Sequence, residues 1–127
     1  MGRPVLYGAS YSVHVRIACL ALHEKGVEFE RVPVDIFSNE LPSDYLLLHP
    51  FGKIPVLEHD GFRLFETNAI TRYVDETFPG PPLQPESARA RARMNQLIAV
   101  LDNYAYKAMV GDVFAEQEKA GRGGTGR

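Results

Sequence analysis

The sequence predicts an α/β domain followed by the start of an all-helical domain. Two short β-prone runs flank a helical pattern near the N-terminus, and Asp60-Gly61 separates two further apolar runs. A strand, a helix and a strand joined in this way favour parallel pairing, whereas Asp-Gly between apolar runs is typical of an antiparallel hairpin. After a proline-rich segment, residues 87–110 show only a helical apolar pattern.

The chain begins with a strand and a helix. Val5-Leu6-Tyr7 is a short apolar strand candidate that ends at Gly8, and a polar run follows it. Residues 13–25 predict a helix, because apolar side chains recur there at helical spacing. These apolar positions are Val13, Ile17, Leu20 and Ala21. Gly26 stands where the C-terminal cap of this helix belongs.

The remaining elements complete a β-α-β-α-β-β-α order. Residues 28–36 predict a second strand, although Pro33 indicates an edge position or a bulge. One or two short helical turns follow in residues 44–50. Two strands then flank Asp60-Gly61, and Thr67 is a plausible N-cap for the last helix. The apolar face of that helix comprises Ile70, Tyr73, Val74 and Phe78.

The second part of the chain is predicted to be one long helix. The segment "PGPPLQPE" (Pro79 to Glu86) contains four prolines and cannot continue a helix. Ser87 then caps a helix whose apolar stripe needs a partner surface. The stripe comprises Met94, Leu97, Ile98, Leu101, Tyr104, Ala105 and Ala108. Residues 116–127 are glycine-rich at their end and should be disordered. The expected boundaries are 1–80 for the first domain, 81–86 for the linker and 87–127 for the incomplete helical domain with its tail.

Composition limits the classes of function that the chain can serve. At 127 residues and a formal net charge of -2, the chain gives no electrostatic reason to expect nucleic acid as a partner. One cysteine allows no internal disulfide and no CxxC pair. The four histidines show no metal-ligand spacing, so no metal site is expected. No apolar run is long enough to cross a bilayer and no signal core stands at the N-terminus, so we expect a cytoplasmic location and no membrane partner.

Residues 51–70, "FGKIPVLEHDGFRLFETNAI", combine features that could hold a peptide. A cis Ile54-Pro55 bond would present the backbone of Ile54 for strand addition. Only about 5 to 6% of X-Pro bonds in folded proteins are cis, so an ordinary trans strand start is the alternative. The helix start after Thr67 would attract a carboxylate, and Glu66 could pair with an amino group. A simple N-cap at Thr67 and a solvated charge at Glu66 are the alternatives.

Ser12 stands at the start of the first helix, where it could be an N-cap or a hydroxyl directed at a ligand thiol. A thiol with a pKa of about 8.5 is only a few per cent ionised at pH 7, although the thiolate is the reactive species. Lowering that pKa by about two units needs roughly 2.7 kcal/mol. A charge-assisted hydrogen bond of roughly 1.5 to 3 kcal/mol and a helix N-terminus of up to about 2 kcal/mol are sufficient. Cys19, further along this helix, is expected to be a packed cysteine.

Three segments together resemble the N-terminal domain of cytosolic glutathione transferases, closest to the serine-type, phi-like branch. They are "LYGASYSVHVRIACLALHEKG" (6–26), "HPFGKIPVLEHDGFRLFETNAITRYV" (49–74) and the proline linker. The resemblance implies a thioredoxin-like fold with Pro55 in cis and glutathione as co-substrate. It also implies that Ser12 stabilises the glutathione thiolate. The implied glutathione-binding residues are Lys53, Ile54, Pro55, Glu66 and Thr67.

Two features of the sequence bear on the site residues that the resemblance implies. The loop "FSNELPSDY" (37–45) contains no Lys, Arg or His, whereas phi-like members carry a basic residue there that contacts the glycine end of glutathione. Tyr7 is a rival to Ser12, because other branches of the family activate the thiol with a tyrosine near the end of the first strand. Ser10 and Tyr11 are weaker rivals.

The resemblance implies a glutathione transferase, in which the bound glutathione thiolate attacks a small electrophile. The habit of the family makes a homodimer the expected assembly and detoxification the expected role. Glutathione-dependent isomerisation or peroxide reduction is a related alternative. A second alternative is a non-catalytic glutathione-binding or protein-interaction module, because the chain supplies one helix of the domain that holds the second substrate in the family. The sequence does not identify the electrophile.

Overall fold

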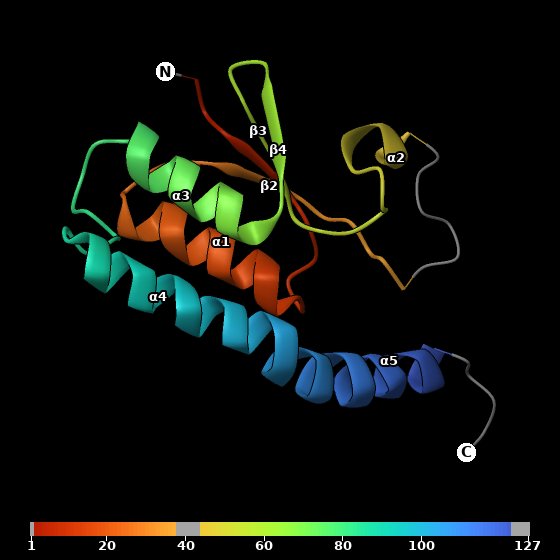
Figure 1. The fold of residues 1–127 in the computed structure, drawn as a ribbon. Helices are drawn as coiled ribbons and strands as arrows, with labels where there is room; N and C mark the ends of the chain where they lie inside the picture. Colours follow the sequence, from red (N-terminus) through yellow and green to blue (C-terminus); the bar gives the residue numbers. More distant parts are fainter. Residues whose placement is uncertain (1, 38–43, 123–127) are drawn as a thin grey trace. The chain divides into compact units, whose positions relative to one another are not determined.

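The computed structural model describes residues 2–37 and 44–122. Its internal contacts divide the chain into two compact units, Met1–Leu83 and Gln84–Arg127. Within the described residues, the first unit contains a four-stranded sheet with three helices, and the second unit is helical (Figure 1).

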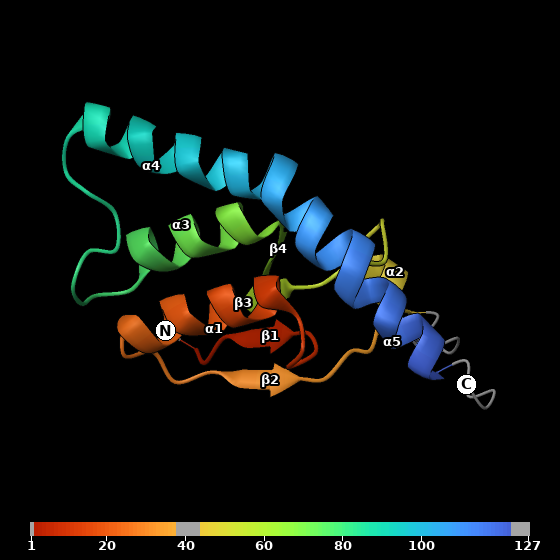
Figure 2. The ribbon, with the colours of Figure 1, turned by 90° about the horizontal axis from the view of Figure 1, so that it is seen from below.

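The first unit has the element order that the sequence predicts. Its strands are β1 (Val5–Tyr7), β2 (Glu30–Val32), β3 (Val56–His59) and β4 (Phe62–Phe65), and its helices are α1 (Val13–Glu24), α2 (Tyr45–Leu48) and α3 (Thr67–Thr77). The strand order in the sheet is β2-β1-β3-β4. β1 and β2 run in parallel, as Figure 2 shows, whereas the β1–β3 and β3–β4 pairs are antiparallel.

β2 is shorter than predicted. The alternating pattern predicts a strand over residues 28–36, but the paired strand covers only Glu30–Val32. Pro33 follows directly and has no backbone N–H to donate to a neighbouring strand, which explains why the pairing stops there. β2 lies at an edge of the sheet, in agreement with the position that Pro33 indicates.

Side chains that alternate along the strands build two separate cores. Leu6 and Leu57 pair across β1 and β3 and pack with the buried residues of α1 and α3. Their neighbours Tyr7 and Val56 belong to a second cluster, which includes Tyr45 of α2. Since successive side chains of a strand point to opposite faces, α1 and α3 cover one face of the sheet and α2 lies on the other. Both views show α1 and α3 side by side, with α2 apart from them (Figures 1 and 2).

α1 is the helix predicted from residues 13–25, but its buried face differs from the predicted stripe. Of the four predicted apolar positions only Ala21 is buried, and Leu20 is 60% exposed. The buried residues are Val15, Ala18, Ala21 and Leu22. Apolar side chains occur on both sides of this helix, so their spacing alone could not determine which side faces the sheet.

Gly26 ends α1 as predicted. It has a φ of 69°, in the left-handed region that glycine adopts without a steric penalty. The N–H of Gly26 donates to the carbonyl of His23, and the N–H of Val27 donates to the carbonyl of Leu22. These two bonds form the Schellman motif, which satisfies carbonyl groups that the helix end would otherwise leave unpaired.

The β3–β4 hairpin turns at Asp60-Gly61, as the sequence predicts. Asp60 has a φ of 49° and Gly61 a φ of 80°. Two consecutive positive φ values are typical of the type I′ turn, whose twist matches that of antiparallel strands. Ile70 and Val74 of α3, which follows the hairpin, and its C-cap residue Phe78 are buried. Tyr73 is half-buried and packs against the same core, so the predicted apolar face is correct.

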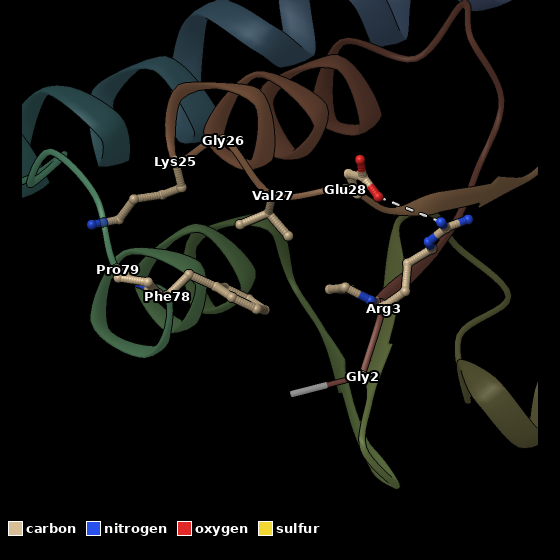
Figure 3. Close-up of a pocket in the computed structure, with 9 residues that line it drawn as sticks. Gly2, Arg3, Lys25, Gly26, Val27, Glu28, Phe78 and Pro79 are labelled. Atoms are coloured by element: carbon tan, nitrogen blue, oxygen red, sulfur yellow. Dashed lines mark hydrogen bonds and ion pairs between the residues drawn. The ribbon is translucent and has the colours of Figure 1, made fainter.

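A buried ion pair joins the end of α1 to α3. The Nζ atom of Lys25 lies 2.9 Å from the Oδ1 atom of Asp75, and the two side chains are 3% and 7% exposed. Lys25 also donates to the carbonyl of Gly80 at 3.5 Å, and the N–H of Leu83 donates to Asp75 at 2.8 Å. In Figure 3 the side chain of Lys25 extends beside Pro79. The pair therefore also fixes Gly80 and Leu83, which follow α3, to the end of α1 and to α3 within the first unit.

The second unit is continuously helical from Ala88 to Arg122. It comprises α4 (Ala88–Val100), the π-helical segments η1 (Leu101–Ala105) and η2 (Lys107–Phe114), and α5 (Ala115–Arg122). Ser87 is the N-cap of α4, as predicted, and its Oγ atom accepts a hydrogen bond from the N–H of Ala90 at 3.1 Å. A π-helix takes up more residues per turn than an α-helix, so the predicted apolar stripe changes its register after Val100.

The prediction of a disordered tail is wrong for residues 116–122, which belong to α5. Glu, Gln, Lys and Ala fill the first part of this segment and have high helix propensities. Glycines become frequent only from Gly121 onward. Residues 123–127, on which the rest of that prediction falls, lie outside the described part of the chain.

Replacing Lys25 by Met should lower the free energy of unfolding by roughly 3 to 5 kcal/mol, because the buried carboxylate of Asp75 would lose its cation. Arg3→Met is the matched control: Arg3 forms an exposed ion pair with Glu28, with side chains 63% and 88% exposed. This control should change the stability by less than about 1 kcal/mol. Urea unfolding followed by circular dichroism measures both variants. A Lys25→Met chain as stable as the Arg3→Met chain would show that the buried pair contributes nothing.

Candidate functional site

The register of the sheet brings three backbone segments to the same edge. Tyr7, the last residue of β1, pairs with Val56, the first residue of β3. Val56 pairs in turn with Phe65, the last residue of β4. Three chain segments therefore meet at one end of these strands, and we call this end the open edge of the sheet. They are the segments after Tyr7, before Val56 and after Phe65. These segments contain the predicted site residues Ser12, Lys53, Ile54, Pro55, Glu66 and Thr67.

Ser12 is the N-cap of α1. Its Oγ atom accepts a hydrogen bond from the N–H of Val15 at 3.3 Å, and the residue is half-buried. Its backbone is extended, with a φ of -76° and a ψ of 127°, as is usual for an N-cap. A hydroxyl group has two lone pairs and one hydrogen, so an accepted bond leaves the hydrogen free to be donated. The N-cap interpretation is confirmed, and it is compatible with a second role as a donor.

The Ile54–Pro55 peptide bond is cis. Pro55 is buried, whereas Ile54 is half-buried and packs against both cores. Pairing between β1 and β3 begins at Val56, so the backbone of Ile54 lies outside that ladder. The side chain of Lys53 is exposed, and its carbonyl accepts a hydrogen bond from the hydroxyl of Tyr45 at 2.5 Å. An extended peptide could therefore pair with the backbone of Ile54 as an additional strand.

The start of α3 differs from the prediction. Thr67 is the first helical residue, and Glu66 occupies the N-cap position. The prediction that Thr67 is the N-cap is wrong, because the chain turns into the helix one residue earlier, at the positive φ of Glu66. Glu66 makes no side-chain cap hydrogen bond, whereas α1 and α4 each begin with a serine cap. The first N–H groups of α3 are therefore not satisfied by the residue that normally does so.

The backbone of Glu66 is strained. The residue has a φ of 76° and a ψ of 118°, although it is not a glycine, and its side chain is exposed. Such a conformation costs on the order of 1 to 3 kcal/mol, and residues of this kind cluster at ligand sites. The carbonyl of Glu66 accepts a hydrogen bond from the N–H of Ile70 at 2.9 Å, which ties it to the first turn of α3. The strain is a local observation that points to a function at this position.

Tyr7 is directed to the face of the sheet that α2 covers. Its side chain packs against the second core, and its hydroxyl donates a hydrogen bond to the Oε1 atom of Glu58 at 2.5 Å. This bond to a carboxylate, together with burial, raises the pKa of Tyr7 to about 12. The same bond is the main cause that lowers the pKa of Glu58, and Arg63 adds to that effect. The hydroxyl hydrogen of Tyr7 is thus already used within the protein.

The two weaker rivals of Ser12 have other surroundings. The hydroxyl of Tyr11 donates to the Oδ1 atom of Asp35 at 2.8 Å and accepts from the N–H of Ile36 at 3.2 Å. Ser10 is exposed, and its carbonyl accepts a hydrogen bond from Arg16 at 2.8 Å. Tyr11 thus bridges the loop after β1 to the segment after β2.

Cys19 is a packed cysteine, as predicted. It is half-buried and lies against the first core. Burial raises the pKa of its thiol, and the nearby charge of Arg31 only partly opposes this effect. A thiol with a raised pKa supplies little thiolate at neutral pH, so Cys19 is a poor nucleophile.

Sequence reasoning missed two residues that fix the loop before Ile54. Tyr45 and His49 are 3% and 2% exposed, and both bond to the backbone of this loop. The Nδ1 atom of His49 accepts a hydrogen bond from the N–H of Phe51 at 3.1 Å. An Asn or Asp at that position would have been a familiar sign of a side chain bonded two residues ahead, but a histidine gives no such signal.

Three further expectations concern what the site lacks. In residues 2–37 and 44–122, no three side chains of His, Cys, Asp or Glu gather as metal ligands would. Over the same residues, no helix combines the length and apolarity that crossing a bilayer requires. Positions 38–43 of the loop without basic residues lie outside the described part of the chain.

Two hollows on the first unit lie apart from the predicted site residues. One has a volume of about 370 Å³ and lies among Lys25, Val27 and Phe78 (Figure 3). The other has a volume of about 510 Å³ and lies between the sheet and α2, beside Tyr7 and Leu48. None of the predicted site residues lines either hollow. The candidate site at the open edge of the sheet thus rests on the strand register and not on either of these hollows.

A family model and the curated relatives described here identify the same family. The family "Glutathione S-transferase, N-terminal domain" matches residues 5–76. Glutathione S-transferase F13 of Arabidopsis thaliana is 49% identical over 73 residues, which are 56% of this chain and 33% of that protein. Glutathione S-transferase F9 of the same plant is 36% identical over 98 residues, which are 75% of this chain and 45% of that protein. The chain thus spans less than half the length of these curated relatives.

Solved structures agree with the sequence relatives. An epsilon-class glutathione S-transferase from the housefly, Musca domestica, matches with a TM-score of 0.81 and 28% identity, over 89% of this chain and 53% of that one. Glutathione transferase F7 from Populus trichocarpa matches with a TM-score of 0.68 and 36% identity, over 85% of this chain and 52% of that one. The expected thioredoxin-like fold, followed by a helical region, is confirmed. Because the family match at residues 5–76 covers more than half of the 127 residues, the protein belongs to the glutathione S-transferase family.

Proposed function

We propose that the protein is a glutathione transferase whose first unit binds glutathione at the open edge of the sheet. The strand register carries the proposal, because the segments with Ser12, Ile54 and Glu66 leave the sheet at one edge. Membership of the glutathione S-transferase family supports it. The chain spans only part of its relatives, so the activity is proposed for the whole protein.

The central part of glutathione would pair with the backbone of Ile54. The N–H and C=O groups of this residue lie outside the β1–β3 ladder, at the point where the cis bond to Pro55 turns the chain. Strand addition of this kind uses main-chain hydrogen bonds and therefore suits a peptide. The exposed ammonium group of Lys53, next in the chain, would attract the glycine carboxylate.

The γ-glutamyl end would bind at the start of α3. The first N–H groups of this helix receive no side-chain cap from Glu66, so they can bond to the carboxylate of the ligand. The exposed carboxylate of Glu66 would pair with the ligand's amino group, and the strained backbone of this residue holds it beside Thr67. Both charged groups of the γ-glutamyl unit would thus find opposite charge within one turn of chain.

Ser12 would stabilise the glutathione thiolate. Its hydroxyl hydrogen remains available, and it stands at the N-terminus of α1, where the helix dipole favours an anion. Tyr7 is the less suitable donor, because Glu58 already accepts its hydroxyl hydrogen. The negative charge on Glu58 would also repel a thiolate rather than stabilise it.

The second substrate would be a small electrophile that the thiolate attacks, with no metal in the reaction. The comparisons do not favour the alternative of a non-catalytic module. A homodimer, a cytoplasmic location and a role in detoxification belong to the same proposal. For the dimer, Leu47 and Phe51 are 79% and 71% exposed and supply apolar surface beside α2.

Calorimetric titration should detect one glutathione per chain. The dipeptide cysteinylglycine, which lacks the γ-glutamyl unit, should bind at least about tenfold more weakly, because it loses the charged contacts at the start of α3. Glu66→Gln should weaken glutathione binding by about three- to tenfold and leave dipeptide binding unchanged. Glu28→Gln is the matched control, because Glu28 is an exposed glutamate that forms an ion pair with Arg3.

Two results would contradict this assignment of the γ-glutamyl end. The first is equal affinity for glutathione and the dipeptide. The second is an equal loss of affinity in Glu66→Gln and Glu28→Gln. Absence of glutathione binding by the folded chain would contradict the proposed function itself.

Ser12→Ala should raise the pKa of the bound glutathione thiol by about one to two units, because the thiolate loses one charge-assisted hydrogen bond. The ultraviolet absorbance of the bound thiolate, followed against pH, measures this shift without any electrophile. Conjugation of an aryl halide at neutral pH should fall by about ten- to a hundredfold in an active preparation.

Ser87→Ala is the matched control for this variant. Ser87 caps α4 with the same kind of hydrogen bond, so its loss carries a similar cost in stability, typically about 1 kcal/mol. It should leave the thiol pKa unchanged. Tyr7→Phe tests the rival directly: if it raises the thiol pKa and Ser12→Ala does not, the assignment of Ser12 is wrong and Tyr7 takes its role.

A further inference from the structure

His49 lies at a junction between α2, the loop before β3 and the end of β4. It follows the last residue of α2 and is 2% exposed. Its ring packs against the ring of Phe65, with ring centroids 4.5 Å apart, and Phe65 directly precedes Glu66. Its Nδ1 atom accepts a hydrogen bond from the N–H of Phe51 at 3.1 Å. One side chain thus touches both segments that would hold the ends of glutathione.

The loop from residue 51 to residue 53 is bonded to α2 and its C-cap at every step. His49 accepts the N–H of Phe51 with its ring and the N–H of Gly52 with its carbonyl, at 3.1 and 3.0 Å. Tyr45 donates its hydroxyl hydrogen to the carbonyl of Lys53 at 2.5 Å. These three bonds set the path of the chain as it enters Ile54. The position of the backbone groups of Ile54 therefore depends on them.

The bond from Phe51 exists only while His49 is neutral. A backbone N–H is a donor, so Nδ1 must present a lone pair, and the ring proton must be on Nε2. Protonation would give the ring a second N–H group, at Nδ1. This donor would face the N–H of Phe51, which is also a donor. The hydrogen bond would then break, and the loop would lose one of its three attachments.

We propose that His49 is a positioning residue for the glutathione site and that its protonation weakens glutathione binding. The inference rests on the proposed function, since it concerns the same site. The affinity for glutathione should therefore fall as the pH drops below neutral. His49 acts through the loop and does not itself touch the ligand.

The charged and titratable groups around His49 are consistent with this direction. Burial lowers the pKa of His49, the carboxylate of Glu66 at the N-cap of α3 partly opposes this effect, and Lys53 in the loop adds to it. Tyr45 on α2 stays neutral over the relevant range, because burial raises its pKa to about 12. A lowered pKa in the folded state means that His49 remains neutral at pH 7. The loop is then intact above the ordinary histidine value of about 6.5 and loses its attachment as the pH falls through the lower folded value.

The test measures glutathione affinity by calorimetry between pH 7.5 and pH 4.5 for the full chain and two variants of His49. His49→Asn supplies an amide oxygen that can accept the N–H of Phe51 and does not titrate. His49→Phe keeps the aromatic packing against Phe65 and removes the acceptor. His23→Asn is the matched control, because His23 is an exposed histidine at the end of α1.

In the unchanged chain, the dissociation constant should rise by about two- to tenfold more between pH 7.5 and pH 4.5 than in His49→Asn, the range that one hydrogen bond supplies. Titration of other groups affects both chains and cancels in this comparison. His49→Asn should bind within about threefold of the unchanged chain at pH 7.5. His49→Phe should bind about two- to tenfold more weakly already at pH 7.5, and His23→Asn should follow the unchanged chain at every pH.

Amide hydrogen exchange of Phe51, observed by NMR without glutathione, provides a second readout. Its protection factor should fall at acid pH in the unchanged chain and stay constant in His49→Asn. Equal pH profiles of affinity in the unchanged chain and His49→Asn would overturn the role of His49 while leaving the proposed function in place. Absence of binding at every pH would overturn the proposed function and the inference that rests on it.

Discussion

The alignment of Tyr7, Val56 and Phe65 across three strands is the constraint on which the rest of the first unit depends. Because side chains alternate along a strand, a slip of one residue would exchange the faces of the affected strand. The fully buried pair of Leu6 and Leu57 opposes such a slip, since it belongs to the core under α1 and α3. The edge that carries the candidate site is therefore fixed by apolar packing one residue further into the sheet.

The two faces of the sheet serve different purposes. The core under α1 and α3 is built on an apolar cluster around Leu6 and Leu57, with the buried Lys25–Asp75 pair beside it, and supplies the cohesion of the unit. On the α2 face, Tyr7, Tyr45 and His49 are polar groups with hydrogen-bond partners. Buried polar groups of this kind cost stability unless each is satisfied, but they define one backbone arrangement more sharply than apolar contacts do. That face is consequently suited to hold a loop in one conformation.

The parts of the fold that sequence could predict are those set by local chemistry. Some features require particular residue types and can therefore be recognised from sequence alone. They are the Asp60-Gly61 turn, the Gly26 cap and the serine caps. The sheet that α1 packs on decides which side of this helix is buried. Because apolar residues occur on both sides of α1, their spacing does not predict the buried side. The strained backbone of Glu66 depends on how the whole sheet places β4 and α3, and no local pattern encodes it. The bond to His49 joins residues only two apart, but a histidine is not a familiar sign of such a bond.

Ser12 shows why a structural and a functional interpretation of one residue need not exclude each other. As an N-cap, its oxygen accepts a hydrogen bond and helps to hold the first turn of α1. This bond uses a lone pair of the oxygen, so the hydroxyl hydrogen is left for a second partner. A threonine could do both, whereas an aspartate would cap the helix well and repel a thiolate. Of the usual N-cap residues Ser, Thr, Asp and Asn, the proposed chemistry therefore leaves those with a hydroxyl or a neutral amide group. Between these two groups, only the hydroxyl has a single hydrogen to donate.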